Sequence, residues 1–216
     1  MLKLVIFDYD GLMVNSEYVV YDALKSFFKK YNYDLSWKYF CKHIGKSVRD
    51  ALKHFYKDYP LPLSFDEFLR ERNKIVSEYV KKKLKLMPCL KELLDCLAKR
   101  SIPMAIATSG TREYIHSGLN KFGIKDYFKD IVCIDDVMRG KPHPDLIMET
   151  LRKTNFTASE SLIIEDSPNG IEAARRAGIY SIAVPTEGVS FHEFKNANII
   201  SSSLKDVKEL MTLFAF

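Results

Sequence analysis

Several residue types that define particular protein classes are scarce in this chain. Its 216 residues include four cysteines, nine glycines and one tryptophan, and no apolar run approaches the roughly 18 residues that a membrane-spanning helix needs. The cysteines match neither a Cys-x-x-Cys pair nor a zinc ribbon, which predicts reduced, buried thiols and excludes a disulfide scaffold. The apolar stretch at the N-terminus is too short for a signal peptide. We therefore expect a cytoplasmic protein without a membrane span.

What the chain does contain is typical of a folded globular protein. Hydrophobic residues make up 47% and charged residues 28%, which excludes disordered and collagen-like chains. A length of 216 residues predicts one domain, or one domain with a smaller insert. The 33 Lys and Arg exceed the 28 Asp and Glu, so the net charge is 33 − 28 = +5. This balance leaves nucleic acid, a membrane surface and small anionic substrates open as partners.

Short apolar runs alternate with helical patterns and predict an α/β fold. Continuous apolar runs of this kind are typical of strands that are covered on both faces of a parallel sheet. The predicted strands are Leu4–Phe7, Pro103–Ala107, Ile131–Ile134, Ser161–Ile164, Ser181–Val184 and Ala197–Ile200. Because helical patterns separate these runs from about residue 85 onward, we expect a doubly wound, Rossmann-like parallel sheet.

Residues 16–84 differ from the rest because they contain helical stretches and no convincing strand run. The predicted helices are Ser16–Tyr31, Ser47–Tyr56 and Ser64–Lys83. The last begins with a capping box, since Glu67 follows Ser64 by three residues. We therefore predict an α/β core of residues 1–15 and 85–216, with a small all-helical domain of residues 16–84 inserted after the first strand.

Acidic residues follow two of the predicted strands. Asp8 and Asp10 come directly after the first strand, and Glu165 and Asp166 end the run at Ser161–Ile164. Ligands of an open parallel sheet bind beyond the carboxyl ends of its strands. Paired carboxylates at that edge can share a hard cation such as Mg²⁺, or divide the work of nucleophile and proton carrier. The alternative for Asp8 and Asp10 is a pair of solvated loop residues that cap the next helix.

Hydroxyl and lysine side chains are expected at the same edge. Thr108 and Ser109 follow the second predicted strand, where hydroxyl and backbone N–H groups can hold phosphate oxygens. Lys141 precedes Pro142 in a loop, and a lysine close to two carboxylates and a phosphate would offset charge on both. Taken singly, the Thr108 segment equally predicts a cap for a helix that starts near Thr111, and a loop lysine predicts a surface residue.

Together these motifs resemble the haloacid dehalogenase superfamily, and the resemblance covers essentially the whole chain. The phrases GKPHPD and EDSPNGIEAARRAG are similar to its branch of sugar-phosphate phosphatases and phosphomutases. That branch implies that the helical insert is a cap domain. The residues that carry the resemblance, each at a strand end, are Asp8, Asp10, Thr108, Lys141, Glu165 and Asp166.

The resemblance implies a Mg²⁺-dependent phosphatase that acts on a small phosphorylated metabolite, such as a sugar phosphate. In this mechanism Asp8 attacks phosphorus and becomes an aspartyl phosphate, while Asp10 protonates the leaving oxygen and then activates water. The implied Mg²⁺ site consists of the Asp8 carboxylate, the Asp10 carbonyl, the Asp166 carboxylate and, through water, Glu165. The implied phosphate-binding residues are Thr108, Ser109 and Lys141.

Two alternatives from other functional classes remain. A β-phosphoglucomutase would carry a histidine on the first cap helix, and the corresponding stretch Glu17–Val20 contains none, which favours the hydrolase. A non-enzymatic protein that binds partners on the same fold is disfavoured because the catalytic positions are all present.

True dehalogenases lack the second aspartate, which is present here as Asp10. Asn15 stands where the branch usually has aspartate, and we expect only a local effect on the hinge to the cap.

The helical insert is predicted to set substrate specificity. Arg49, which follows Gly45-Lys46-Ser47, is the candidate for reaching a distal group of the substrate, and an exposed helix arginine is the alternative. Residues 16–84 carry 15 basic and 9 acidic residues, a net of 15 − 9 = +6, so the positive charge lies in the insert and favours a small anionic substrate. We expect no nucleic-acid or membrane partner, and a monomer or weak dimer.

Overall fold

The computed structural model describes residues 2–45 and 48–213, which group into two compact units. The first unit comprises Met1–Val14, Leu86–Thr186 and Ser190–Phe216. The second comprises Asn15–Lys85 together with Glu187–Val189, a short segment that is distant from it in sequence. Among the described residues, no helix combines the length and the apolar character that a membrane crossing requires.

The first unit is built on a six-stranded parallel sheet with the strand order β3-β2-β1-β4-β5-β6. The strands are β1 (Leu4–Phe7), β2 (Met104–Ala107), β3 (Phe128–Val132), β4 (Ser161–Glu165), β5 (Tyr180–Ala183) and β6 (Ile199–Ile200). The chain runs outward from β1 to β3 and then returns to β4 on the other side of β1. The order therefore reverses between β1 and β4, where doubly wound sheets bind ligands.

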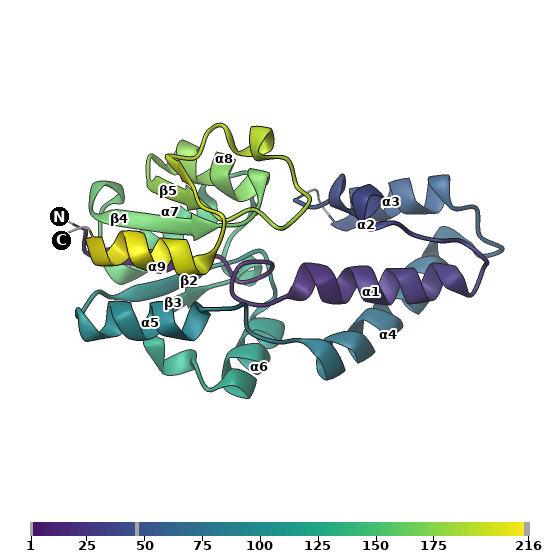
Figure 1. Ribbon diagram of the computed structural model, residues 1–216, viewed down its shortest axis with the longest axis horizontal. Helices are drawn as coiled ribbons and strands as arrows, with labels where there is room; N and C mark the ends of the chain where they lie inside the picture. Colours follow the sequence, from purple (N-terminus) through teal and green to yellow (C-terminus); the bar gives the residue numbers. More distant parts are fainter. Residues whose placement is uncertain (1, 46–47, 214–216) are drawn as a thin grey trace. The chain divides into compact units, whose positions relative to one another are not determined.

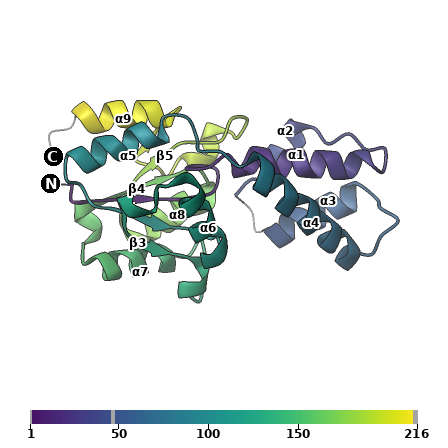
Figure 2. The same cartoon turned by 90° about the horizontal axis from the view of Figure 1, so that it is seen from below.

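Helices cover both faces of this sheet, which confirms the predicted doubly wound α/β fold. Helices α5 (Leu90–Lys99) and α9 (Leu204–Leu213) pack together on one face, and α7 (Asp145–Thr154) lies on the opposite face (Figures 1 and 2). Helix α8 (Pro168–Ala177) packs beside α7. Helix α6 (Arg112–Phe122) connects β2 to β3. The sheet is consequently buried between two helical layers.

Strand β1 shows why the central strands are continuous apolar runs. Leu4 and Ile6 belong to the cluster that includes Leu146 and Ile147 of α7, and the intervening Val5 is equally inaccessible to solvent. Successive side chains of a strand point to opposite faces, so a strand covered on both faces needs an apolar residue at every position.

The predicted strand Ile131–Ile134 is wrong in its bounds, since β3 is Phe128–Val132. Strand β3 lies at one edge of the sheet, pairs only with β2, and exposes Lys129. An edge strand is not covered by neighbouring elements on all sides, so it can contain polar residues. Such a strand does not form the continuous apolar run from which strands were predicted. Ile134 instead begins a short 3₁₀ helix.

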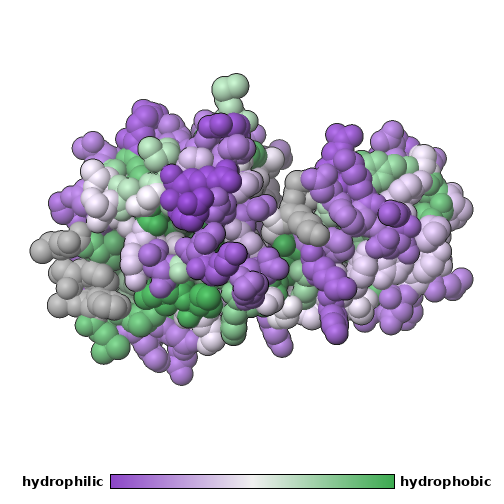
Figure 3. Space-filling model, turned by 90° about the horizontal axis from the view of Figure 1, so that it is seen from above, coloured by the Kyte–Doolittle hydropathy of each residue, from purple (hydrophilic) through white to green (hydrophobic). Residues whose placement is uncertain are grey.

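The second unit consists of helices joined by loops, with no strand among the residues that the structure describes. Its helices are α1 (Ser16–Lys29), α2 (Trp37–Cys41), α3 (Val48–Asp58) and α4 (Phe65–Lys83). The short helix α2 was not predicted. The capping box of α4 is present, because Glu67 N–H donates to Ser64 Oγ at 3.3 Å and Ser64 N–H donates to Glu67 Oε2 at 2.8 Å. Hydrophilic side chains cover most of this unit on the face shown in Figure 3.

Hydrogen bonds join parts of the second unit that are far apart in the sequence. Asn15 N–H donates to the carbonyl of Lys85 at 3.1 Å, and Asn15 Oδ1 accepts from Lys85 N–H at 2.8 Å. An amide oxygen is sufficient to accept the hydrogen bond from Lys85 N–H, so this contact does not require the charge of an aspartate at position 15. Trp37 Nε1 donates to the carbonyl of Glu187 at 3.0 Å, which fixes the Glu187–Val189 segment to α2.

Candidate active site

The loop after β1 carries Asp8 and Asp10 at the carboxyl edge of the sheet. Asp8 N–H donates to the carbonyl of Ile164 at 3.0 Å, so the backbone still follows the sheet at the position of the first aspartate. Gly11 then turns with φ +76°, a conformation that L side chains rarely adopt. A Cβ on Gly11 would lie 1.9 Å from Oδ2 of Asp166. Glycine at this position therefore allows the Asp166 carboxylate to approach the β1 loop.

Lys141 joins two buried carboxylates at the carboxyl ends of neighbouring strands. Its Nζ donates to Asp8 Oδ1 and, at 2.5 Å, to Glu165 Oε1. The side chains of Lys141, Asp8 and Glu165 are 6%, 8% and 0% exposed, so these ion pairs are largely shielded from water. Glu165 Oε2 accepts from Ser167 N–H at 2.7 Å. The lysine is thus fixed in place by one acceptor directly after β1 and another at the end of β4.

Three buried carboxylates form a potential metal site. One oxygen from each of Asp8, Glu165 and Asp166 can be chosen so that all three lie within 4.8 Å of one another. Thr186 Oγ1 donates to Asp166 Oδ2 at 3.3 Å and orients that carboxylate. With all three carboxylates ionised, the single positive charge of Lys141 leaves a net charge of 1 − 3 = −2, in a setting where unbalanced charge is costly. The donor set and its excess negative charge fit a divalent cation with oxygen ligands.

Burial and neighbouring charges shift the pKa values of both partners in the Lys141–Asp8 pair. Burial raises the pKa of Asp8 to about 7, and the nearby ammonium of Lys141 opposes that rise. Burial alone would lower the pKa of Lys141, but the carboxylates of Asp8 and Glu165 outweigh it and raise this pKa above its usual value. Lys141 therefore carries its charge at neutral pH, and a cation beside Asp8 would favour the carboxylate form.

Asp10 is more accessible than Asp8, and it contacts helix α6. Tyr114 Oη donates to Asp10 Oδ1 at 2.8 Å. The ring of Tyr114 packs edge-to-face on Tyr9, with centroids 5.8 Å apart and planes at 89°. Our sequence analysis missed both Tyr114 and Thr186. Thr186 lies shortly after β5, so the strand-end rule signals it, whereas no sequence pattern distinguishes Tyr114 from any other helical tyrosine.

Thr108 and Ser109 lie at the end of β2, next to β1. Thr108 is buried, and its Oγ1 accepts from Gly110 N–H at 3.1 Å. Ser109 is exposed, and its Oγ is 3.9 Å from the position that a Cβ on Gly140 would occupy, which places it beside the Lys141 loop. The N-cap of α6 is Thr111, so neither residue is the cap of that helix.

Arg49 belongs to the second unit and lies on α3 with an exposed side chain. Lys46 and Ser47, which precede it in the predicted substrate loop, are outside the described residues. The buried carboxylates all belong to the first unit, and Arg49 belongs to the second. The role of Arg49 therefore stays a prediction.

Comparison with known proteins assigns the chain to a family. Residues 5–184 match the family described as haloacid dehalogenase-like hydrolase. The chain belongs to this family. A divalent cation is the usual cofactor of haloacid dehalogenase-like hydrolases, and the cluster of Asp8, Glu165 and Asp166 offers oxygen ligands for one.

Several haloacid dehalogenase-like proteins are similar over most of the chain. It is 32% identical over 205 residues to the bifunctional riboflavin kinase/FMN phosphatase of Arabidopsis thaliana, a match that covers 94% of this chain and 54% of that protein. It is 26% identical over 185 residues to the phosphorylated carbohydrates phosphatase of Thermotoga maritima, covering 84% of each. The chain thus spans only about half the length of the first of these relatives.

The solved structure of a β-phosphoglucomutase from Clostridium difficile superposes with a TM-score of 0.72. The match covers 99% of this chain and 100% of that one, at 22% identity. Similarity at this level of identity concerns the fold alone. It confirms the haloacid dehalogenase-like architecture and does not separate phosphatases from mutases.

The residue between the two aspartates supports a prediction about stability. Tyr9 is fully buried, and its hydroxyl has no hydrogen-bond partner among the described residues. The hydroxyl packs against Gly118 of α6, where a Cβ would lie 1.9 Å away. A buried, unsatisfied hydroxyl costs free energy, so Tyr9→Phe should raise the free energy of unfolding by about 1 kcal/mol.

Urea unfolding of the metal-free protein measures this effect. The matched control is Tyr127→Phe, which removes a hydroxyl that donates to Asp95, and it should leave stability unchanged or lower it. A Tyr9→Phe protein that is less stable than the parent would show that the hydroxyl is satisfied in solution.

Proposed function

We propose that the protein is a Mg²⁺-dependent phosphatase that hydrolyses a small phosphorylated metabolite, most suitably a sugar phosphate, through an aspartyl phosphate. The observation that carries this proposal is the buried Asp8 carboxylate, held by Lys141 and placed beside two further carboxylates at the switch point of the sheet. Such a site combines a fixed nucleophile with the charge that a transferring phosphoryl group needs.

Asp8 and Asp10 divide the chemistry in this proposal. A carboxylate oxygen of Asp8 forms a bond to phosphorus while the ester P–O bond breaks, and Asp10 gives its proton to the departing alkoxide. Asp10, now ionised, takes a proton from water as that water attacks phosphorus. The bond between Asp8 and phosphorus then breaks, which releases inorganic phosphate and restores the Asp8 carboxylate.

The phosphoryl oxygens are held by residues on two loops. Thr108 Oγ1 already accepts from Gly110 N–H, so its hydroxyl hydrogen is directed elsewhere and suits a phosphoryl oxygen. Ser109 lies beside the loop of Lys141 and adds N–H and hydroxyl donors. Lys141 would offset the charge on the transferring group while it holds Asp8.

The acidic residues of the first unit suit Mg²⁺, which supplies charge neutralisation for the phosphoryl group when it is bound. Asp8 and Asp166 would bind it through carboxylate oxygens and Asp10 through its backbone carbonyl. Glu165 uses its two oxygens for Lys141 and Ser167, so it would act through water.

The second unit is proposed to be the cap that selects the substrate. Its net charge of +6 over residues 16–84 suits a phosphorylated substrate, and the exposed Arg49 is the candidate for a distal group. Two relatives whose names describe phosphatases of FMN and of phosphorylated carbohydrates support a phosphorylated metabolite as substrate class.

A screen of phosphorylated metabolites, with and without Mg²⁺, tests the proposed function. We expect release of inorganic phosphate from at least one sugar phosphate, and none in the presence of EDTA. A second assay with β-glucose 1-phosphate and glucose 1,6-bisphosphate separates hydrolase from mutase. Glucose 6-phosphate that accumulates without matching phosphate would identify a mutase, and inactivity on the whole panel would favour a binding protein.

Metal binding should also stabilise the protein in the absence of substrate. At tenfold the dissociation constant, Mg²⁺ should add about 1.4 kcal/mol of stability and raise Tm by about 3–6 °C. Asp166→Asn should remove most of this shift, because it replaces a charged ligand by a neutral one. Asp95→Asn, on α5 and away from the site, serves as the matched control and should keep the shift. An equal shift in parent and Asp166→Asn would place the metal elsewhere.

A further inference from the structure

We propose that Tyr114 is a positioning residue that fixes Asp10 for proton transfer to the leaving oxygen. This inference rests on the proposed function, because it assigns a task within the same site. Its basis is a hydrogen bond between helix α6 and the loop after β1, in which the Tyr114 hydroxyl donates to Asp10, the proposed proton carrier. The proposed nucleophile, Asp8, is held separately by Lys141.

The two aspartates of the site differ in burial and in the side chains that donate to them. Asp8 is buried and held by Lys141 within a group of charged side chains. Asp10 follows in a loop that turns at Gly11, and it is more accessible to solvent. A short side chain in such a position has several rotamers, and each rotamer directs its oxygens to a different place. A donor at a fixed point selects among them.

Tyr114 is well placed to be that donor. Its ring is held edge-to-face against Tyr9, the residue between the two aspartates, and Tyr9 itself is fully buried. Its backbone lies in the first turn of α6, so it moves with a helix rather than with a loop. From this support the hydroxyl donates to Asp10 Oδ1 at 2.8 Å. Tyr9 follows Asp8 directly in the chain and supports Tyr114, which in turn orients Asp10. The orientation of Asp10 is therefore coupled to the position of Asp8.

The hydrogen bond involves the group of Asp10 that transfers the proton. Oδ1 accepts from Tyr114, and this contact fixes the orientation of the carboxyl group that carries the proton to the departing alkoxide and later accepts one from water. A proton carrier must lie within hydrogen-bond reach of its target, and a loss of orientation lowers the rate without weakening substrate binding. The effect of Tyr114 should hence appear in the chemical step.

The dependence of the rate on the leaving group separates a role in proton transfer from a purely structural role, which would affect all substrates equally. A sugar alkoxide is a poor leaving group and depends on protonation by Asp10, whereas 4-nitrophenolate departs without it. Damage to the nucleophile, to phosphate binding or to the fold would slow both substrates alike. Damage to the orientation of Asp10 slows only the sugar phosphate in kcat/KM, which reports the steps up to formation of the aspartyl phosphate.

The experiment compares Tyr114→Phe with the parent enzyme, using the best sugar phosphate from the screen and 4-nitrophenyl phosphate. We expect kcat/KM to fall by about 10-fold for the sugar phosphate, a part of the 10²–10⁴-fold that general acid–base catalysis contributes. For 4-nitrophenyl phosphate we expect kcat/KM to change by less than about 2-fold, because its leaving group departs without protonation by Asp10. Tyr114→Met, which also lacks the hydroxyl, should show the same selectivity.

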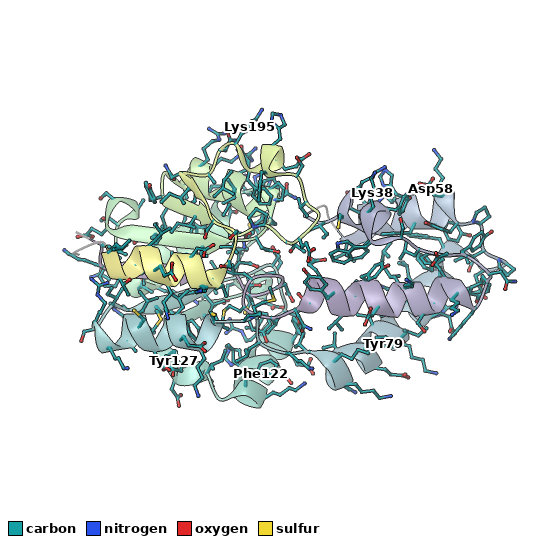
Figure 4. The ribbon with its side chains drawn as sticks, in the orientation of Figure 1. Lys38, Asp58, Tyr79, Phe122, Tyr127 and Lys195 are labelled. Atoms are coloured by element: carbon teal, nitrogen blue, oxygen red, sulfur yellow. The ribbon has the colours of Figure 1, made fainter. Side chains whose placement is uncertain are left out.

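Tyr127→Phe is the matched control for this experiment. Tyr127, labelled in Figure 4, also donates its hydroxyl to an aspartate, Asp95 of α5, but it precedes β3 and so lies at the amino edge of the sheet. It should leave both substrates unaffected. Equal losses for the two substrates in Tyr114→Phe, no loss, or a gain would overturn the inference. A parent enzyme that hydrolyses neither substrate would instead overturn the proposed function itself.

Discussion

Asp8→Asn should abolish phosphatase turnover, with kcat reduced by at least about 10⁴-fold, as expected when an enzyme loses its covalent nucleophile. The amide retains the shape of the carboxylate and can still accept a hydrogen bond from Lys141, but it cannot form the acyl phosphate. Burial already raises the pKa of Asp8, so replacing it by a neutral group removes a charge that the fold accommodates at a cost. The variant should therefore fold, and it should be at least as stable as the metal-free parent.

Two measurements separate this outcome from general damage. Steady-state hydrolysis of the best substrate gives the loss of kcat, and thermal unfolding without metal gives the stability. Acid quench with ³²P-labelled substrate should trap a phosphorylated protein in the parent and none in Asp8→Asn. Asp95→Asn is the control for the substitution itself and should retain activity. Full activity in Asp8→Asn would refute the assignment of the nucleophile.

Lys141→Met should impair both activity and folding. Removing the ammonium leaves the buried carboxylates of Asp8 and Glu165 without the cation to which both are bonded. Loss of one partner from a buried charge pair costs about 3–5 kcal/mol, and loss of a donor to the phosphoryl group costs about 10²–10³-fold in kcat. Lys153→Met is the matched control, because Lys153 is 25% exposed and lies 3.5–3.9 Å from its carboxylate partners. That substitution should change stability by less than about 1 kcal/mol.

The stability deficit of Lys141→Met should depend on pH. The pKa of Asp8 is raised in the folded state, so its contribution to stability is fully present below the unfolded value of 3.8 and is lost as pH rises through about 7. Without Lys141 the pKa of Asp8 rises further, so the ionised form becomes costlier in the variant than in the parent. Urea unfolding of the metal-free proteins should show a smaller deficit at pH 5 than at pH 8. A deficit that is independent of pH would mean that the loss is one of packing.

Most of the fold could be predicted from local patterns. The bounds of β1 are those expected, because Leu4–Phe7 is covered on both faces and all four residues must be apolar. The capping box of α4 was also readable, since Ser64 and Glu67 bond each other across a single turn. Prediction was wrong for β3, whose polar residues at the sheet edge broke the pattern, and it missed the short helix α2.

The candidate site divides in the same way. Asp8, Asp10, Glu165 and Asp166 are found at strand ends. The rule that finds them needs only a strand and the few residues at its carboxyl end. Of the donors that orient them, Thr186 lies shortly after β5 and is within reach of this rule, although our sequence analysis missed it, whereas Tyr114 lies within a helix and could not be found in this way.

Sequence patterns alone are sufficient to establish the family, the position of each acidic residue at a strand end and the concentration of positive charge in residues 16–84. The packed fold was needed to show that Lys141 donates to Asp8, 133 residues away, and to Glu165, and that Tyr114 donates to Asp10 across 104 residues. It also decided that Glu187–Val189 joins the helical unit. The physical reason is the range of the forces involved. Apolar periodicity and capping act over a few residues, whereas these contacts exist only after the sheet and its helices have packed.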